Sequence, residues 1–461
     1  MKMITRRGLF LLVLVVAFLG GLGFLTYSFV SDGAKWAMQP YNYDLYYNGD
    51  LIAAGTITDS NGTVLAETVD GKRVYNEDKT TRKSTLHTVG DTKGFISTGV
   101  QSTYKSKLIG YNPLNGIYSI VKNGSGNNME LTINSDVCDV AYDALSDYKA
   151  GCVGVVNYKT GEIVCMVSTP SYDPMNKPSD IDTNDIYSGA YINRLLSGMY
   201  TPGSTFKIVT AICAVENIPD IQSRTFECKG EYDAGGTPIE CNGYHGTISF
   251  NDALAKSCNS AFAQIAIELG PEKLAKTAEQ LGLTSAVSVS GNITSSTGRF
   301  FLEKGDANDY IGWTGIGQGD TLVSPVAMLR LVSAIANDGS VPSFNIVNSF
   351  ATKAGKALDF DFISRNTQLL SSETADVMKN MMRYNIVEQY GDYNYEGLNL
   401  CAKSGTAQID AVDSHNTAWF VGFMDDEQNP YAFVVLVEHG NSGSQTAGPI
   451  ANRVLQALVN D

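Results

Sequence analysis

Internal repeats, coiled-coil heptads and low-complexity tracts are absent from the 461-residue sequence. Hydrophobic residues make up 43% of the chain and charged residues 18%, which is typical of a globular protein and not of a disordered one. Because a chain of this length is too long for one compact core, we expect two or more domains.

Basic residues are scarce. Three of the 33 lysines and arginines lie before residue 8, and all 48 acidic residues lie after residue 30. Residues 31–461 therefore carry 30 basic and 48 acidic side chains, a formal net charge of −18. This charge argues against nucleic acid or anionic lipid as a partner of that part of the chain.

A signal-peptidase site is not evident near the N-terminus. Residues 8–30 form an uncharged apolar run of 23 residues, and no Ala-x-Ala site follows it. A helix of about 20 apolar residues spans a bilayer, and the basic residues lie on its N-terminal side. The sequence predicts a cytoplasmic segment (1–7), an uncleaved single-pass anchor in the cell membrane (8–30) and an extracytoplasmic remainder. A cleaved signal peptide is the alternative.

The hydrophobic pattern divides the remainder into two parts. Residues 31–130 hold short alternating runs around the turn signal Asp59-Ser-Asn-Gly62, which predicts a small β-rich stalk domain. Residues 131–461 predict an α+β domain, in which helices flank an antiparallel sheet built from both ends of the domain. Strands are expected at 51–57, 63–67, 152–157, 162–168, 400–408, 418–424 and 432–438, and helices at 137–148, across much of 204–285 and at 448–458.

The eight cysteines show no common zinc-ligand spacing. Cys228 and Cys241 flank a polar, glycine-rich loop, and an extracytoplasmic location would permit a disulfide between them. We therefore predict this disulfide and no metal. The alternative is a zinc site made by Cys228, Cys241 and His245.

Three short motifs that suit acyl transfer follow one another: Ser204-Thr-Phe-Lys207, Ser257-Cys-Asn259 and Lys403-Ser-Gly405-Thr406. An apolar run follows the first motif, so Ser204 is expected at a helix N-terminus with Lys207 one turn away on the same face. A neutral Lys207 could then take the serine proton. Alone, this motif would equally fit a helix cap with a solvated lysine.

The second motif lies between two predicted helices. Ser257 could relay a proton to a leaving amine, and Asn259 could hold a substrate amide. An ordinary helix cap is the alternative.

The third motif lies in a predicted strand whose edge could pair with an extended substrate, and Gly405 would remove a side chain where the ligand approaches. Lys403 would help to keep Lys207 neutral and would attract a carboxylate. The backbone N–H groups of Ser204 and Thr406 could form an oxyanion hole. The alternative is an edge strand with a solvated lysine.

The three motifs resemble those of the penicillin-binding proteins and serine β-lactamases. The resemblance extends to neighbouring segments: Pro170-Ser-Tyr-Asp-Pro174, Tyr200-Thr-Pro-Gly203, Gly243-Tyr-His-Gly246, Gly315-Ile-Gly-Gln-Gly319 and Ala336-Asn-Asp-Gly339. Residues 131–461 are similar to the transpeptidase domain of the class B, monofunctional proteins, and the layout is most similar to the compact penicillin-binding protein A type. This resemblance implies a serine β-lactamase-like fold with a five-stranded antiparallel sheet and an inserted helical subdomain.

The resemblance also implies a peptidoglycan D,D-transpeptidase that cross-links stem peptides through a serine acyl-enzyme and is acylated by β-lactams. Ser204 would be the nucleophile and Lys207 the base, while Ser257, Asn259 and Lys403 would assist catalysis. Ser404, Gly405 and Thr406 would bind the substrate carboxylate and oxyanion. No cofactor is expected.

Peptidoglycan stem peptides and β-lactams are the expected ligands. Only about 100 residues separate the anchor from the catalytic domain, which leaves no room for a polymerase domain. A multi-spanning membrane glycosyltransferase is therefore an expected partner, and nucleic acid is not.

Other functions share parts of this pattern. A β-lactamase needs a base that activates water, but Glu-x-x-Leu-Asn does not occur between the second and third motifs, and Glu396-Gly-Leu-Asn399 is one residue short. A β-lactam sensor would need a cytoplasmic signalling segment, and an inactive scaffold would be expected to lack a motif residue. A D,D-carboxypeptidase would use the same residues, so the sequence leaves it open.

Overall fold

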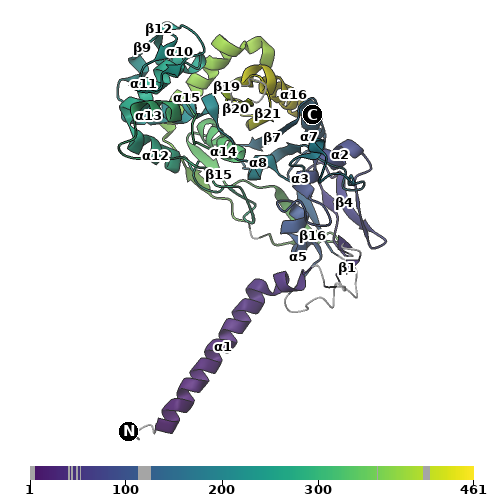
Figure 1. The fold of residues 1–461 in the computed structure, drawn as a ribbon. Coiled ribbons are helices and arrows are strands. Elements are labelled where there is room, and N and C mark those ends of the chain that lie inside the picture. The colour runs from purple at the N-terminus through teal and green to yellow at the C-terminus, as the bar shows by residue number, and fades with distance from the viewer. Residues whose placement is uncertain are drawn as a thin grey trace.

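The structure is a computed structural model that describes residues 6–39, 42, 45–47, 50–51, 53–112, 126–360, 362–408 and 416–460. Helix α1 (Arg6–Ala37) projects away from a globular body that holds the other elements (Figure 1). It contains the predicted anchor, and its apolar side chains from Leu9 to Val30 are mostly exposed. Among the described residues, α1 is the one helix long and apolar enough to cross a membrane.

A five-stranded antiparallel sheet forms the centre of the body, in the strand order β19-β20-β21-β7-β8. Its strands are β7 (Ala150–Asn157), β8 (Ile163–Thr169), β19 (Leu400–Ala407), β20 (Thr417–Met424) and β21 (Tyr431–Glu438). All five predicted strands of this sheet are confirmed, with ends that differ by one or two residues. Their long apolar runs made them readable, because both faces of the sheet are buried.

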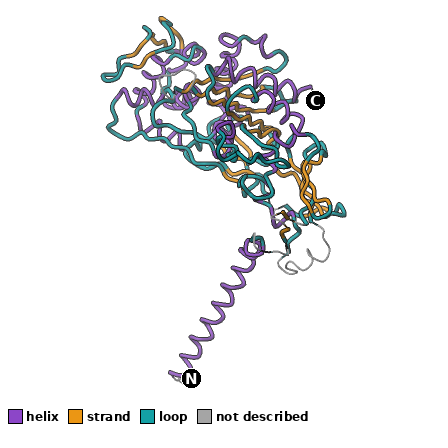
Figure 2. The backbone as a smooth tube through the Cα atoms, turned by 45° about the vertical axis from the view of Figure 1, so that its right-hand side comes forward, coloured by secondary structure: helices purple, strands orange, loops and turns teal. Residues whose placement is uncertain are grey.

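Helices cover both faces of this sheet (Figures 1 and 2). On one face α7 (Ser135–Leu145) packs against α16 (Gly448–Asn460), and on the other α14 (Pro325–Ala336) packs beside α8 (Arg194–Ser197). Two glycines of β7 allow this close packing. A Cβ at Gly151 would lie 2.9 Å from Leu145 of α7, and one at Gly154 would lie 2.7 Å from Leu195 of α8.

The segment between β8 and β19 supplies most of the remaining helices: α9 (Lys207–Asn217), α10 (Phe250–Ala255), α11 (Asn259–Leu269), α12 (Pro271–Gln280), α13 (Asn308–Gly315) and α15 (Ser372–Asn385). The prediction of helix across 204–285 is correct for four of these helices. The prediction left room for the polar loop between Cys228 and Cys241 but did not predict strands there: β9 (Thr225–Cys228) pairs with β12 (Gly246–Ser249), and β10 (Glu231–Tyr232) pairs with β11 (Ile239–Glu240). Polar and glycine-rich residues there favour hairpins over helix.

A second sheet has the order β17-β16-β6-β3-β4-β5. Its strands are β3 (Ile57–Thr58), β4 (Val64–Val69), β5 (Lys72–Tyr75), β6 (Asn127–Leu131), β16 (Val347–Thr352) and β17 (Ala357–Leu358). The predicted turn at Asp59 is present, since its Oδ1 accepts hydrogen bonds from the N–H groups of Asn61 and Thr63. The predicted strand 51–57 is wrong over 53–56, where the backbone is not in a strand.

Strands β16 and β17 come from the C-terminal half of the chain but complete this N-terminal sheet, which the sequence did not predict. The N-terminal segment also carries α2 (Lys79–Ser84), α3 (Leu86–Val89), α4 (Val100–Thr103) and α5 (Lys105–Leu108), so it is mixed in structure. An ion pair joins it to the central body: Arg82 contacts Asp173 at 2.7 Å, and both side chains are largely buried.

Candidate active site

The three motifs meet at one cleft of about 380 Å³. Ser204 lies in a short 3-10 turn (Gly203–Phe206) that runs into α9, so it stands just before the α-helix and not in its first turn. The second motif connects α10 to α11, and the third lies in β19 at the edge of the central sheet. The residues Ser204, Ser257, Asn259, Ser404, Gly405 and Thr406 line the cleft.

Lys207 is fully buried and lies at the centre of the polar contacts. Its Nζ lies 3.0 Å from Ser204 Oγ, 3.1 Å from Ser257 Oγ, 2.7 Å from the Ser257 carbonyl and 2.6 Å from Asn259 Oδ1. The last two oxygens can only accept, and the Asn259 amide is held in this orientation because its Nδ2 donates to the Glu240 carbonyl at 2.7 Å. A neutral amine would give its two N–H groups to these acceptors and keep its lone pair for a serine hydroxyl.

Ser257 lies between two amines. Lys403 Nζ donates to Ser257 Oγ at 3.1 Å and to the Ser404 carbonyl at 2.8 Å, while Lys207 contacts the same hydroxyl. Ser257 has a φ of 54°, a left-handed conformation that is unusual for a residue with a side chain. A continuous path of polar atoms therefore leads from Lys207 through Ser257 to Lys403.

Burial favours the neutral form of both lysines. The pKa of Lys207 is well below its usual value, first because the amine is buried and second because the positive charge of Lys403 is close. Burial likewise lowers the pKa of Lys403 to about 7. Lys207 can therefore act as a base near neutral pH, which an exposed lysine cannot do.

Close packing fixes the turn that carries Ser204. Gly203 has a φ of 54°, and a Cβ at this position would lie 2.6 Å from the Thr406 carbonyl oxygen. Gly317 packs on the same turn: its carbonyl accepts from the Gly203 N–H at 2.9 Å, and a Cβ there would lie 2.1 Å from the Gly203 carbonyl oxygen. The glycine-rich segment 315–319 thus holds the nucleophile against the third motif.

A partly buried polar network supports the approach to this turn. Glu438 at the end of β21 accepts hydrogen bonds from Tyr200 Oη at 2.7 Å and from Arg194 Nε at 2.8 Å. Trp419 of β20 donates its ring N–H to the Thr201 carbonyl at 3.1 Å. The sequence did not indicate Glu438 or Trp419 as partners of this turn, because both lie far from it along the chain and carry no local signal.

The free edge of β19 faces the cleft, since among the described strands β19 pairs with β20 alone. The Ser404 N–H points away from β20, because it donates to Tyr390 Oη at 3.0 Å. Backbone groups two residues apart on a strand point the same way, so the Thr406 N–H also points to the free edge. Tyr390 thus covers the edge at Ser404 and leaves the Thr406 end for a ligand. The sequence did not indicate Tyr390 as a residue of the site.

Gly405 has a packing role that the sequence did not predict. A Cβ on this residue would lie 2.8 Å from Thr205 Cγ2 and 3.0 Å from the Pro202 carbonyl oxygen. The glycine therefore allows β19 to pack on the turn of the nucleophile. Gly405 also lines the cleft, and its expected role of making room for a ligand stays a prediction.

The predicted disulfide between Cys228 and Cys241 is wrong, because both cysteines are free in the structure. Their thiols instead face a common imidazole. Cys228 Sγ lies 3.4 Å and Cys241 Sγ 3.6 Å from His245 Nδ1, and Cys241 Sγ lies 3.8 Å from Cys258 Sγ. Cys258, the middle residue of the second motif, was not part of the predicted disulfide or of the alternative zinc site.

Comparisons with known proteins agree with this arrangement. The family described as penicillin binding protein transpeptidase domain matches residues 151–456. The peptidoglycan D,D-transpeptidase PbpA of Mycolicibacterium smegmatis is 26% identical over 517 aligned positions and covers 99% of each chain. Stage V sporulation protein D of Bacillus subtilis is 27% identical, over 73% of this chain and 53% of that protein.

Solved structures show the same fold. The penicillin G acyl-enzyme complex of penicillin-binding protein A from Mycobacterium tuberculosis matches with a TM-score of 0.76 at 24% identity, over 88% of this chain and 99% of that chain. The matched family covers more than half of the sequence and includes all three motifs. The chain therefore belongs to the penicillin-binding protein transpeptidase family.

Proposed function

We propose that this chain is a peptidoglycan D,D-transpeptidase that works through an acyl-enzyme on Ser204. The contact between Ser204 Oγ and the buried Lys207 Nζ, at 3.0 Å, carries the proposal. A serine hydroxyl is a weak nucleophile unless a nearby base removes its proton.

In the acylation step, Lys207 takes the proton of Ser204 as Oγ attacks the carbonyl carbon of a substrate amide. The N–H groups of Ser204 and Thr406 stabilise the negative charge on the carbonyl oxygen. Ser257 then passes a proton to the leaving amine, and the proton on Lys207 replaces it through the 3.1 Å contact. The C–N bond breaks, and an ester links the substrate to Ser204.

In the second step, an amine from another stem peptide attacks this ester. The same groups work in reverse: Lys207 or Ser257 takes the proton of the incoming amine, and Ser204 recovers its own. Lys403 contributes positive potential for the substrate carboxylate, and Asn259 orients a substrate amide. A D,D-carboxypeptidase would differ only in using water as the acceptor.

Labelled penicillin and mass spectrometry test the acyl-enzyme. We expect one penicilloyl adduct per chain, on Ser204, and no adduct in Ser204→Ala. Thr205→Ser is a matched control that keeps a hydroxyl next to the nucleophile and should still be acylated. An adduct on another residue, or one that persists in Ser204→Ala, would overturn the assignment.

A single-pass topology accompanies this function in our proposal, with α1 uncleaved and the N-terminus in the cytoplasm. The exposed apolar surface of α1 supports it, because water solvates such a helix poorly. We expect a mature chain that begins near Met1 and protease-accessible epitopes only beyond α1. Recovery of a soluble form that starts near Ser31 would refute the anchor.

A membrane glycosyltransferase is the proposed partner, because a transpeptidase can only cross-link strands that another enzyme polymerises. Gly20, Gly21 and Gly23 of α1 have no atom within 4 Å of an added Cβ, so a second helix could approach closely there. Exchange of α1 and the segment 31–130 for unrelated sequences should abolish co-purification with the polymerase, while Ser204 is still acylated. Unchanged co-purification would place the interface elsewhere.

A further inference from the structure

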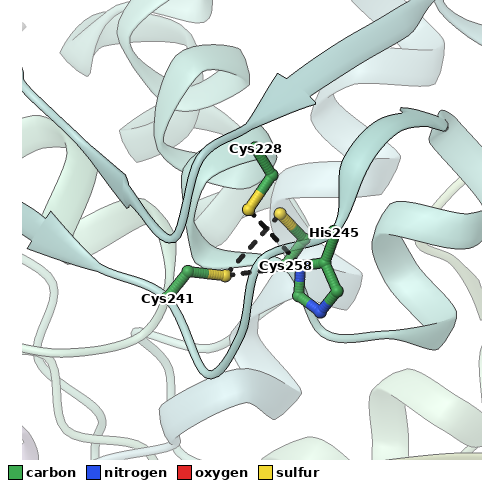
Figure 3. A group of neighbouring side chains, drawn as sticks. All are labelled: Cys228, Cys241, His245 and Cys258. Carbon is green, nitrogen blue, oxygen red and sulfur yellow. Dashed lines mark hydrogen bonds between the residues drawn. The ribbon is translucent and has the colours of Figure 1, made fainter.

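Four potential metal ligands converge beside the second motif: Cys228, Cys241, His245 and Cys258 (Figure 3). They come from separate segments: the end of β9, the residue after β11, the loop before β12 and the N-cap of α11. Their spacing in the chain is Cys-x12-Cys-x3-His-x12-Cys. Folding therefore assembles the group from positions that are not neighbours in the sequence.

Three of the separations between these ligand atoms match those of a tetrahedral metal site. Zinc bonds of about 2.3 Å to sulfur and about 2.05 Å to nitrogen, at tetrahedral angles, place two sulfurs about 3.8 Å apart and a sulfur and a nitrogen about 3.5 Å apart. In the structure, the Cys241 and Cys258 sulfurs are 3.8 Å apart, and the two sulfur–Nδ1 distances to His245 are 3.4 Å and 3.6 Å. All four ligand atoms lie within 4.8 Å of one another. Bonded sulfurs, by contrast, would lie about 2 Å apart.

The surroundings suit thiolates. The backbone N–H of Asn259 donates to Cys241 Sγ at 3.3 Å, and that of Ala261 donates to Cys258 Sγ at 3.4 Å. Cys258 also stands at the N-terminus of α11, where the helix dipole favours negative charge. Cys228 and Cys258 are fully buried, so a bound ion would be largely shielded from water.

We propose that Cys228, Cys241, His245 and Cys258 bind a zinc ion in a closed structural site. Three thiolates and one imidazole form a common set for structural zinc and leave no position for a catalytic water. Binding forms three Zn–S bonds and one Zn–N bond, and the protons of the thiols leave to solvent. This proposal stands apart from the proposed function, since it concerns metal content and local order.

The ion would position the second motif. Cys258 separates Ser257 from Asn259, and the Asn259 N–H and side chain both bond to the segment 240–241. A metal that ties Cys258 to Cys241 thus fixes the two side chains that contact Lys207. The ligands are positioning residues in this proposal, although Cys241 also lines the cleft.

Metal analysis of the full-length protein in detergent tests the site. The protein should be prepared without a polyhistidine tag, because such a tag binds metal ions. Zinc is then measured by elemental mass spectrometry after extensive dialysis. We expect about one zinc per chain, which is lost in Cys228→Ser and His245→Gln. Cys138→Ser is the matched control: it removes a buried cysteine of α7, outside the cluster, and should keep the ion. Cobalt(II) exchange should give the visible bands of a tetrahedral thiolate site in the parent protein and in Cys138→Ser, but not in Cys228→Ser or His245→Gln.

The labelled-penicillin acylation rate gives the second readout. We expect chelation, or His245→Gln, to slow acylation about tenfold, the effect typical of lost support around a site. Absence of zinc from the parent protein, or a disulfide within the cluster on non-reducing peptide mapping, would overturn the metal site. Zinc that can be removed without change in acylation would overturn the positioning role.

Discussion

Replacement of Lys403 by glutamine removes the positive charge nearest to the proposed base. Lys207 Nζ and Lys403 Nζ each lie 3.1 Å from Ser257 Oγ, so the two amines are at most about 6.2 Å apart. At an effective dielectric constant of about 20, two unit charges at this distance repel each other by about 2.7 kcal/mol, or about two pKa units. The Lys403 charge disfavours the Lys207 ammonium, so its removal should raise the pKa of Lys207.

The sign of the pH effect follows from the role of the base. Acylation needs neutral Lys207, so the rate falls as pH drops below the pKa of this amine. A higher pKa in Lys403→Gln moves this acid limb to higher pH, by about one to two units. Because burial lowers the pKa of Lys403 itself to about 7, its charge and the effect of the mutation are largest below that pH.

Stopped-flow acylation with a fluorescent β-lactam, measured across the pH range, gives the position of this limb. Lys403→Arg keeps the charge and should leave the limb in place, even if binding is weaker. A loss in Lys403→Gln that is uniform at all pH values, with an unmoved limb, would refute the electrostatic argument. Lys403 would then act only in substrate binding.

Three further predictions concern turnover, the nucleophile turn and the joint between the two sheets. Penicilloyl-Ser204 should deacylate slowly. The rate should be the same in Glu240→Gln, which neutralises the one acidic side chain among the described residues that line the cleft. Rapid β-lactam turnover by the purified protein would indicate a β-lactamase instead. Gly317→Ala should lower both Tm and the acylation rate, because its Cβ would lie 2.1 Å from the Gly203 carbonyl oxygen. The control Gly319→Ala has a similar φ but no atom closer than 4.0 Å, so it should show only the cost of the left-handed backbone, about 1–2 kcal/mol. Equal effects of the two changes would contradict the packing argument. Arg82→Ala should lower the free energy of unfolding by about 2 kcal/mol near neutral pH, because a hydrogen bond from Arg82 lowers the pKa of Asp173 to about 2. This stabilisation is present at pH values above the ordinary pKa of an aspartate and is lost as the pH falls toward 2. A denaturant midpoint equal to that of the control Lys83→Ala would count against it.

The sequence predicted the central sheet and the three motifs because their signals are local. Four strands of the central sheet, β7, β8, β20 and β21, are mostly apolar runs, and each motif keeps its residues within four positions. Contacts between distant segments carry no such signal. The addition of β16 to β6 depends on pairing with a strand from the other half of the chain, and Tyr390 reaches Ser404 only through the fold.

The cysteine cluster shows the same limit. The sequence indicated Cys228, Cys241 and His245 as a possible site because they lie on or near one polar loop. Cys258 was not included, because it lies between Ser257 and Asn259, which already had predicted catalytic roles. A search of the sequence for all thiols near the second motif could have found it. The packing role of Gly405 could not be predicted either. Its spatial neighbours, Thr205 in the first motif and Pro202 just before that motif, lie far earlier in the chain.

The position of β6 has a consequence for biosynthesis. This strand lies between β3, its parallel neighbour, and β16, whose residues Asn348 and Ser349 donate to Glu130. During synthesis, the N-terminal sheet therefore lacks a strand that leaves the ribosome much later, and such late pairing slows folding and exposes strand edges to aggregation. A fragment that starts at residue 131 would leave β16 without its partner. The two halves of this enzyme are thus expected to mature together, so truncation at either side should yield a chain that depends on chaperones.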